Sequence, residues 1–187
     1  MLKRSVAPAA LVLTASLLLA GCGGGDSTPA AQPGGADAAT GELVTGDGYT
    51  FNAPEGWGVP DQEVPGFTPD VMIANLGDTD GFADNMNVVL SPAGEVTVEQ
   101  AEQSVVSELE AAGYADVEVN DRATIGGDES AHITAALSQG TTSMVMDQFY
   151  VSHSGQTYVV TFSTNDSTPA DDRAAVYEPV LASWAWE

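Results

Sequence analysis

Two histidines, His132 and His153, are the side chains of this 187-residue chain best suited to act as general bases near neutral pH. His132 lies in a stretch of alternating apolar residues, on the side opposite them, which predicts a position at the protein surface. His153 lies between Ser152 and Ser154 at a turn, which predicts a solvated polar side chain. No third residue that would orient either ring is indicated, and the G-x-S-x-G, HExxH and phosphate-loop motifs are absent. The sequence therefore predicts a protein that is not an enzyme.

The chain is strongly acidic, with 27 Asp and Glu residues against 4 Lys and Arg residues and a net charge of −23. Such a surface repels nucleic acids and anionic lipid headgroups, because both are bound through Lys and Arg. A nucleic-acid partner is therefore excluded, and a generic solvated surface is favoured over one adapted to cationic partners. Paired carboxylates can cleave glycosidic bonds, so a secreted carboxylate-based hydrolase is an alternative function.

One acidic loop could bind calcium. Asp78, Asp80, Asp84 and Asn85 surround Gly81 and supply the hard oxygen ligands that calcium takes. The loop differs from an EF-hand, because the glycine comes at its fourth position instead of the sixth and no Glu closes it. A plain polar turn is favoured, and a calcium-responsive binding module is the alternative. No other cofactor is expected.

Aromatic side chains could form a second kind of site, a cleft for a lipid or a glycan. Trp57 and Trp186 are its candidate residues. Core packing is the favoured interpretation of Trp57, as it is of Trp184. Trp186 lies near the end of the chain and is the better residue to test.

A helix is predicted to begin after Thr97, because Thr97 and Gln100 have the spacing of a capping box. Apolar residues follow at helical spacing as far as Gly113, the expected stop. A last helix is predicted after Thr168, with Pro169 at its first position and a later proline expected to kink it.

Strands are predicted on both sides of the first helix. Residues 49–53, 71–76 and 86–90 form short apolar or alternating runs before it. After it, four stretches alternate with a period of two and are separated by short glycine-containing breaks, which predicts an antiparallel meander. The alternating stretches are 117–119, 131–137, 145–151 and 158–162. Strands, helix, meander and helix in this order predict an α+β fold, with helices flanking an antiparallel sheet.

The N-terminus is typical of an export signal. Lys3 and Arg4 precede an apolar run over residues 6–19 that is too short to span a bilayer comfortably. The letters LAGC, ending at Cys22, resemble the lipobox of bacterial lipoproteins. That resemblance implies cleavage before Cys22, a diacylglycerol on its thiol and an acyl chain such as palmitate on the new amine. Two or three acyl chains hold a protein stably on a membrane, so the anchor needs no transmembrane helix.

Three segments follow from this interpretation. Residues 1–21 are the lipoprotein signal peptide, residues 22–42 the lipidated cysteine and a flexible tether, and residues 43–187 the globular domain. The tether is rich in small residues and proline and lacks aromatics, so it cannot bury enough apolar surface to order itself. Cleavage leaves two arginines against all 27 acidic residues, a net charge near −25.

Six stretches of the sequence resemble the PsbP-like superfamily, and look most like its actinobacterial LpqN-type lipoproteins. They are GYTFNAPEGW, DGFADNMNVVL, VTVEQAEQSVVSELEAAGY, ATIGGDESAHITA, QTYVVTFSTN and YEPVLASWAW. The resemblance implies an α/β/α sandwich around an antiparallel sheet, acting as a non-enzymatic accessory or binding protein. It transfers no functional residue, because the family has no fixed active-site motif.

The sequence thus predicts a membrane-anchored, extracytoplasmic lipoprotein. It faces outward at the cell membrane or envelope and acts as a non-catalytic accessory or binding protein. Its expected partner is another envelope protein, or an envelope lipid or glycan.

Overall fold

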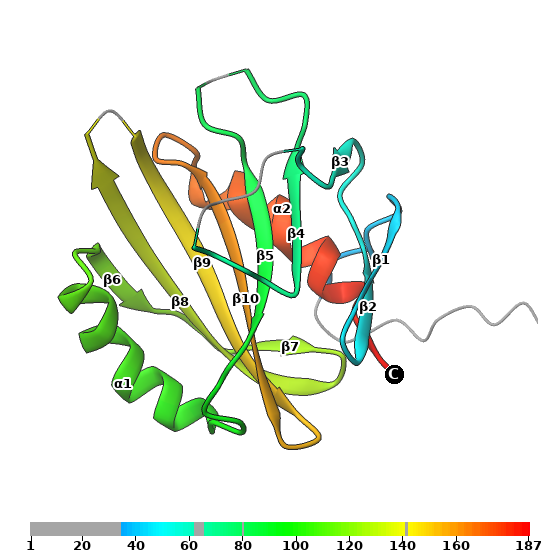
Figure 1. The fold of residues 1–187 in the computed structure, drawn as a ribbon, viewed down its shortest axis with the longest axis vertical. Helices are drawn as coiled ribbons and strands as arrows, with labels where there is room; N and C mark the ends of the chain where they lie inside the picture. The colour runs from blue at the N-terminus through cyan, green and yellow to red at the C-terminus, as the bar shows by residue number, and fades with distance from the viewer. Residues whose placement is uncertain (1–34, 62–65, 80, 141) are drawn as a thin grey trace, which may run out of the picture. The chain divides into compact units, whose positions relative to one another are not determined.

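The computed structural model describes residues 35–61, 66–79, 81–140 and 142–187. The predicted signal peptide and the lipidated Cys22 lie outside these ranges. Within them, no helix is long and apolar enough to cross a membrane. The described residues form an antiparallel sheet with a helix on each face, together with a small second sheet (Figure 1).

The main sheet has eight strands, and seven of them follow the order β3-β4-β5-β10-β9-β8-β6, with β7 also paired to β8. Their bounds are Trp57–Gly58 (β3), Val71–Asn75 (β4), Asn85–Leu90 (β5), Ala115–Val119 (β6), Ala123–Ile125 (β7), Asp128–Gln139 (β8), Thr142–His153 (β9) and Gln156–Asn165 (β10). All of these strand pairs are antiparallel. The predicted pairing of four successive strands is confirmed, because β6, β8, β9 and β10 are neighbours in this order. Glycine-containing hairpins join β8 to β9 and β9 to β10, but the break at residues 126–127 joins β8 to β7, a strand that was not predicted.

The first helix, α1 (Val98–Ala111), covers one face of the meander. Its capping box is confirmed: the Gln100 amide donates to Thr97 Oγ1 at 3.2 Å, and the Thr97 amide donates to Gln100 Oε1 at 2.9 Å. Ala101 and Val105 of α1 pack against Ala131 and Ile133 of β8, and all four are buried. The helix is thereby fixed to the sheet by its apolar stripe.

The second helix, α2 (Ala170–Ala182), covers the opposite face and lies behind the strands in Figure 1. Val180 and Leu181 of α2 are buried in the larger hydrophobic core. Pro169 is the N-cap and not the first helical residue as predicted, and no side chain caps the helix. The Thr168 carbonyl instead accepts from Arg173 Nη1 at 3.2 Å. Helix termini shift by a residue or two in this way because the first turn is weakly specified by local sequence.

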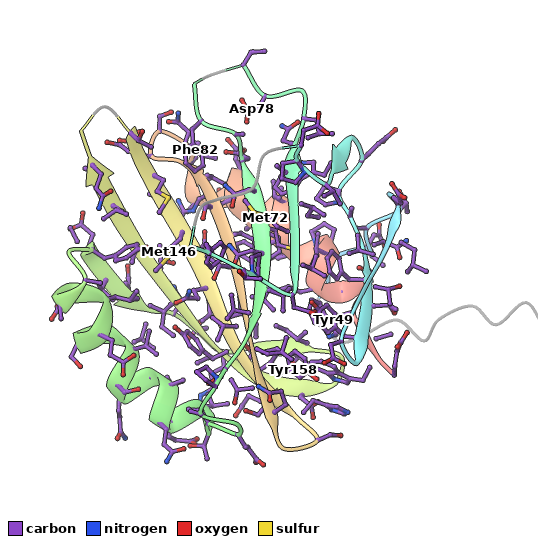
Figure 2. All side chains as sticks on the ribbon, in the orientation of Figure 1. Tyr49, Met72, Asp78, Phe82, Met146 and Tyr158 are labelled. Atoms are coloured by element: carbon purple, nitrogen blue, oxygen red, sulfur yellow. The ribbon has the colours of Figure 1, made fainter. Side chains whose placement is uncertain are left out.

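A small sheet completes the larger core. Its strands, β1 (Leu43–Gly46), β2 (Tyr49–Asn52) and β11 (Ala185–Trp186), have the order β1-β2-β11. Tyr49 and Phe51 of β2 are fully buried, and both rings stack on Trp184, at 4.4 Å and 5.3 Å between centroids. In Figure 2, Tyr49 and Tyr158 lie near each other at this end of the sheet, and their rings meet edge to face at 5.5 Å.

The end of the predicted tether belongs to the domain. The Ala39 amide donates to the Pro179 carbonyl at 2.8 Å, and the Gly41 amide donates to the Ala53 carbonyl at 3.1 Å. The Glu42 carbonyl accepts from the Ala53 amide at 2.9 Å. Residues 39–42 are therefore held against the domain, which corrects the tether boundary drawn at residue 42. Composition did not indicate this, because the partners are backbone groups far away in the sequence.

Candidate functional site

The larger core contains a buried carboxylate, that of Asp147 in the middle of β9, which is 2% exposed. Its Oδ1 accepts hydrogen bonds from His132 Nε2 at 3.0 Å and from Thr134 Oγ1 at 2.9 Å. Its Oδ2 accepts from Arg173 Nε at 2.7 Å. Three donors from β8 and α2 thus surround this carboxylate, which compensates for its removal from water.

Strand register and the position of α2 bring this cluster together. Thr134 of β8 lies directly opposite Asp147 of β9, and His132 lies opposite Phe149, two residues along each strand. Side chains two residues apart on a strand share a face, so those of His132 and Thr134 on β8 and of Asp147 and Phe149 on β9 all point toward α2. Arg173 stands in the first turns of α2, where its guanidinium reaches the strand pair.

Asp147 is ionised in this setting. Burial by itself raises the pKa of the Asp147 carboxyl, but the hydrogen bonds from His132 and Arg173 and the Arg173 charge outweigh it. The resulting pKa lies below the ordinary value of 3.8. An ionised carboxylate only accepts hydrogen bonds, so we assign the proton of the shared contact to His132 Nε2.

The predicted surface position of His132 is wrong: the residue is 8% exposed. Its ring stacks on Phe149 at 4.3 Å between centroids and meets the ring of Tyr177 edge-on at 5.4 Å. The alternation along β8 is real, but α1 covers one face and α2 covers the other, so neither face is solvent-exposed. The lone acidic residue within the apolar run of β9 was the available signal, because a carboxylate there requires a partner.

A pocket of about 670 Å³ opens beside this cluster. Its wall combines the aromatic side chains that contact His132 with residues of β7 and the β6–β7 connection, of α2 and of the N-terminal segment. The lining residues are Gly35, Ala36, Asn120, Asp121, Arg122, Ala123, Thr124, His132, Phe149, Tyr177, Glu178, Leu181 and Ala182. Its size and mixed lining are those of a small-molecule site.

His153 has partners that the sequence did not indicate. Its Nδ1 lies 2.7 Å from Asp128 Oδ2, and its ring stacks on Trp186 at 4.5 Å between centroids. The predicted solvated side chain is therefore half-buried and held in place. Neither Trp57 nor Trp186 lines the pocket beside His132. Trp57 is half-buried against the larger core, and Trp184 is buried within it, as predicted.

The acidic loop has hydrogen bonds of its own. Asp78 Oδ2 accepts from the Asp84 amide at 3.3 Å, and Asp84 Oδ1 accepts from the Asn165 amide at 3.2 Å. The Asn85 side-chain amide donates within the loop, and Asp80 lies outside the described residues. Figure 2 shows Asp78 and Phe82 beyond the ends of β4 and β5. Among the residues that the structure describes, no three His, Cys, Asp or Glu side chains are grouped as metal ligands. The calcium site stays a prediction. If the loop binds calcium, millimolar calcium should raise the melting temperature of the wild-type protein more than that of the Asp80→Asn variant.

No protein-family model and no curated protein matches the sequence. Solved structures are similar in fold. Cyanobacterial PsbP (CyanoP) of Synechocystis sp. PCC 6803 is 17% identical with a TM-score of 0.51, over 85% of this chain and 98% of that one. LpqN of Mycobacterium tuberculosis, described as involved in cell envelope biogenesis, is 13% identical with a TM-score of 0.50, over 77% and 88%.

A protein of Bacteroides thetaiotaomicron is 12% identical with a TM-score of 0.43, over 74% of this chain. The match covers 45% of that protein, so this chain spans less than half of its length. The likeness to CyanoP and LpqN confirms the predicted α+β, PsbP-like fold. At such identities it concerns the fold and not the function.

Proposed function

We propose that this protein, whose fold is PsbP-like, is a lipid-anchored, outward-facing protein of the cell envelope that binds an envelope component without catalysing a reaction. The observation that carries the binding role is the pocket of about 670 Å³ beside His132. Its lining combines the rings of Phe149 and Tyr177 with polar and charged side chains that could orient a ligand. The description of LpqN as a protein of cell envelope biogenesis supports the setting.

The anchor is part of the proposal. The single cysteine of the chain, Cys22, follows a short apolar run in a lipobox-like stretch. A lipidated Cys22 would hold the domain at the membrane surface with no membrane-spanning helix. The strongly acidic surface suits this arrangement, because it keeps the domain soluble beside the membrane.

A role without catalysis fits the chemistry of the cluster. Both oxygens of Asp147 are engaged by donors, and Arg173 supplies its counter-charge. Among the described residues no hydroxyl or thiol is hydrogen-bonded to Nδ1 of His132. A nucleophile of the serine-hydrolase type therefore has no base in contact with it here.

A hydrolase is the second candidate, and one observation favours it. Asp147 supplies the orienting carboxylate that the sequence did not indicate, so His132 and Asp147 form the base-and-orienter pair of a hydrolytic site. Turnover of envelope esters or glycans by the purified protein, lost in His132→Gln, would replace the binding function with this one.

Crosslinking in intact cells tests the proposal. A photoreactive amino acid replaces Thr124, an exposed residue that lines the pocket, and in a control replaces Glu110, an exposed residue of α1. We expect the same envelope component to be captured from Thr124 in the anchored form, and not from Glu110. The Cys22→Ala form should lose fatty-acid labelling, membrane association and that capture. Equal capture from both positions, or an unchanged Cys22→Ala form, would contradict the proposal.

A further inference from the structure

The pocket beside His132 has two unpaired negative charges at its wall. Asp121 and Glu178 are exposed lining residues, and neither forms an ion pair with a described residue. Arg122 also lines the pocket, but its guanidinium binds Glu102 at 2.7 Å and two further glutamates, at 2.8 Å and 3.0 Å. Arg173 is bound to Asp147. No cation among the described residues is therefore left to receive an anionic ligand.

The buried histidine adds a hydrogen-bond acceptor to this wall. With the proton of the shared contact assigned to Nε2, Nδ1 of His132 is the ring atom that can accept a hydrogen bond in this tautomer. Nδ1 forms no hydrogen bond with a described residue, and it is not among the side-chain atoms sealed from solvent without a partner. Because His132 is 8% exposed and lines the pocket, Nδ1 is open to the pocket itself. Nδ1 is therefore available to accept a hydrogen bond from a donor group in the pocket.

Two aromatic rings also line the pocket. Phe149 and Tyr177 line the pocket and lie 5.1 Å apart between ring centroids. Burial, and then the charges of Asp147 and Glu178, raise the pKa of Tyr177, which places its hydroxyl in the same negative field. The faces and edges of such rings accommodate apolar groups, and their faces attract cations.

We infer that this pocket takes an organic cation, whose ammonium group donates hydrogen bonds to the acceptors of the wall while its apolar part lies against Phe149 and Tyr177. The inference rests on the proposed binding function and names its ligand class. A carboxylate or phosphate ligand is disfavoured, because it would meet Asp121 and Glu178 with no free cation beside them. A neutral alcohol would satisfy the acceptors but would gain nothing from the two carboxylates.

Three probes of one shape separate these ligand classes: 2-phenylethylamine, 2-phenylethanol and 3-phenylpropionate. Isothermal titration calorimetry measures their dissociation constants on the full-length protein in phosphatidylcholine nanodiscs, with empty nanodiscs as the blank. We expect the amine to bind about tenfold more tightly than the alcohol, and the carboxylate to bind most weakly. Equal binding of the alcohol, or tighter binding of the carboxylate, overturns the inference.

A matched pair of charge-removing variants locates the effect. Glu178→Gln changes a lining residue, and Glu110→Gln removes the same charge from α1 on the other face of the sheet. We expect Glu178→Gln to weaken binding of the amine about threefold, the scale of one exposed ionic contact, and Glu110→Gln to leave it unchanged. Equal weakening by both would show a general effect of net charge and would overturn the inference.

The two proposals fail separately. If the crosslinker at position 124 captures an envelope component but 2-phenylethanol binds as well as the amine, the ligand class is wrong and the binding function stands. If the amine binds selectively but nothing from the envelope is captured, the envelope function is wrong and the chemistry of the pocket stands.

Discussion

Arg122 and Arg173 are the two basic residues of the chain beyond Arg4, and they occupy opposite environments. Arg122 is exposed and binds three glutamates, two on α1 and one on β8. Arg173 is largely buried and binds one carboxylate, that of Asp147. The exposed arginine has more partners, yet water and salt already stabilise its charge and those of the glutamates. Water cannot stabilise the charges of the buried pair in this way. We therefore expect the single buried ion pair to contribute more to the free energy of unfolding than the three exposed ones.

Breaking the buried pair should have the largest effect. Arg173→Met keeps an unbranched apolar stem but is shorter than arginine and uncharged, so it leaves the Asp147 carboxylate buried without its counter-charge. We expect the free energy of unfolding to fall by about 3–5 kcal/mol, measured by urea denaturation at pH 7.

The double variant Arg173→Met, Asp147→Asn is the control, since it removes both charges. Part of the lost stability should return in it, because replacing both members of a buried pair is far less harmful than removing one. A single-variant loss below about 1 kcal/mol would show that Asp147 finds another partner.

Removing one hydrogen-bond donor from the same carboxylate, while Arg173 stays in place, should have a smaller effect. His132→Phe preserves a ring that can stack on Phe149 but deletes the hydrogen bond to Asp147 Oδ1. We expect a loss of about 1–3 kcal/mol in the same denaturation experiment. Unchanged stability would mean that stacking, and not the hydrogen bond, holds His132 in place.

Acid should weaken the buried pair by protonating Asp147. A carboxyl whose pKa is lowered on folding adds stability that is complete above its unfolded pKa and is lost as the pH falls through the folded value. The pKa of Asp147 is lowered from 3.8, so the loss should begin below about pH 4. For each pH unit by which folding lowers the pKa of Asp147, the free energy of unfolding should fall by about 1.4 kcal/mol.

Urea denaturation of the wild type and Asp147→Asn from neutral to acid pH isolates this contribution. The stability difference between the two proteins should shrink as the pH falls. Parallel curves would show that Asp147 does not titrate differently in the folded and unfolded protein.

Breaking the exposed cluster should have the smallest effect, despite its three ion pairs. Arg122→Met should destabilise the protein less than either buried variant does, because all four charges are accessible to water. About 1 M salt, where the Debye length is about 3 Å, should abolish the remaining difference from the wild type. A loss as large as that of Arg173→Met would reverse the comparison.

Local features of the fold were predictable from the sequence. The capping box at Thr97 fixes the start of α1 through groups three residues apart, and the glycine-containing breaks fix the hairpins of the meander. Both signals act within a few residues, so they do not depend on the rest of the chain. The short strands β1, β3, β7 and β11 were missed, because each is defined by pairing with a neighbouring strand and not by its own pattern.

The candidate site could be predicted from the sequence only in part. Strand periodicity correctly placed His132 opposite the apolar side of β8, but a single alternating strand does not reveal whether its second face is covered. That depended on α2, which joins Arg173 to Asp147 across 26 residues of sequence. The pocket likewise needs the β6–β7 connection, α2 and the segment at Gly35 to meet.

The sequence by itself determined the order of the two helices and the longer strands, the acidity of the surface and the resemblance to PsbP-like proteins, because these are properties of composition and of short-range spacing. The tertiary structure decided which polar residues are buried, which arginine is shielded from water and where a ligand can enter. Those outcomes depend on burial, which is set by elements distant in sequence packing against both faces of one sheet.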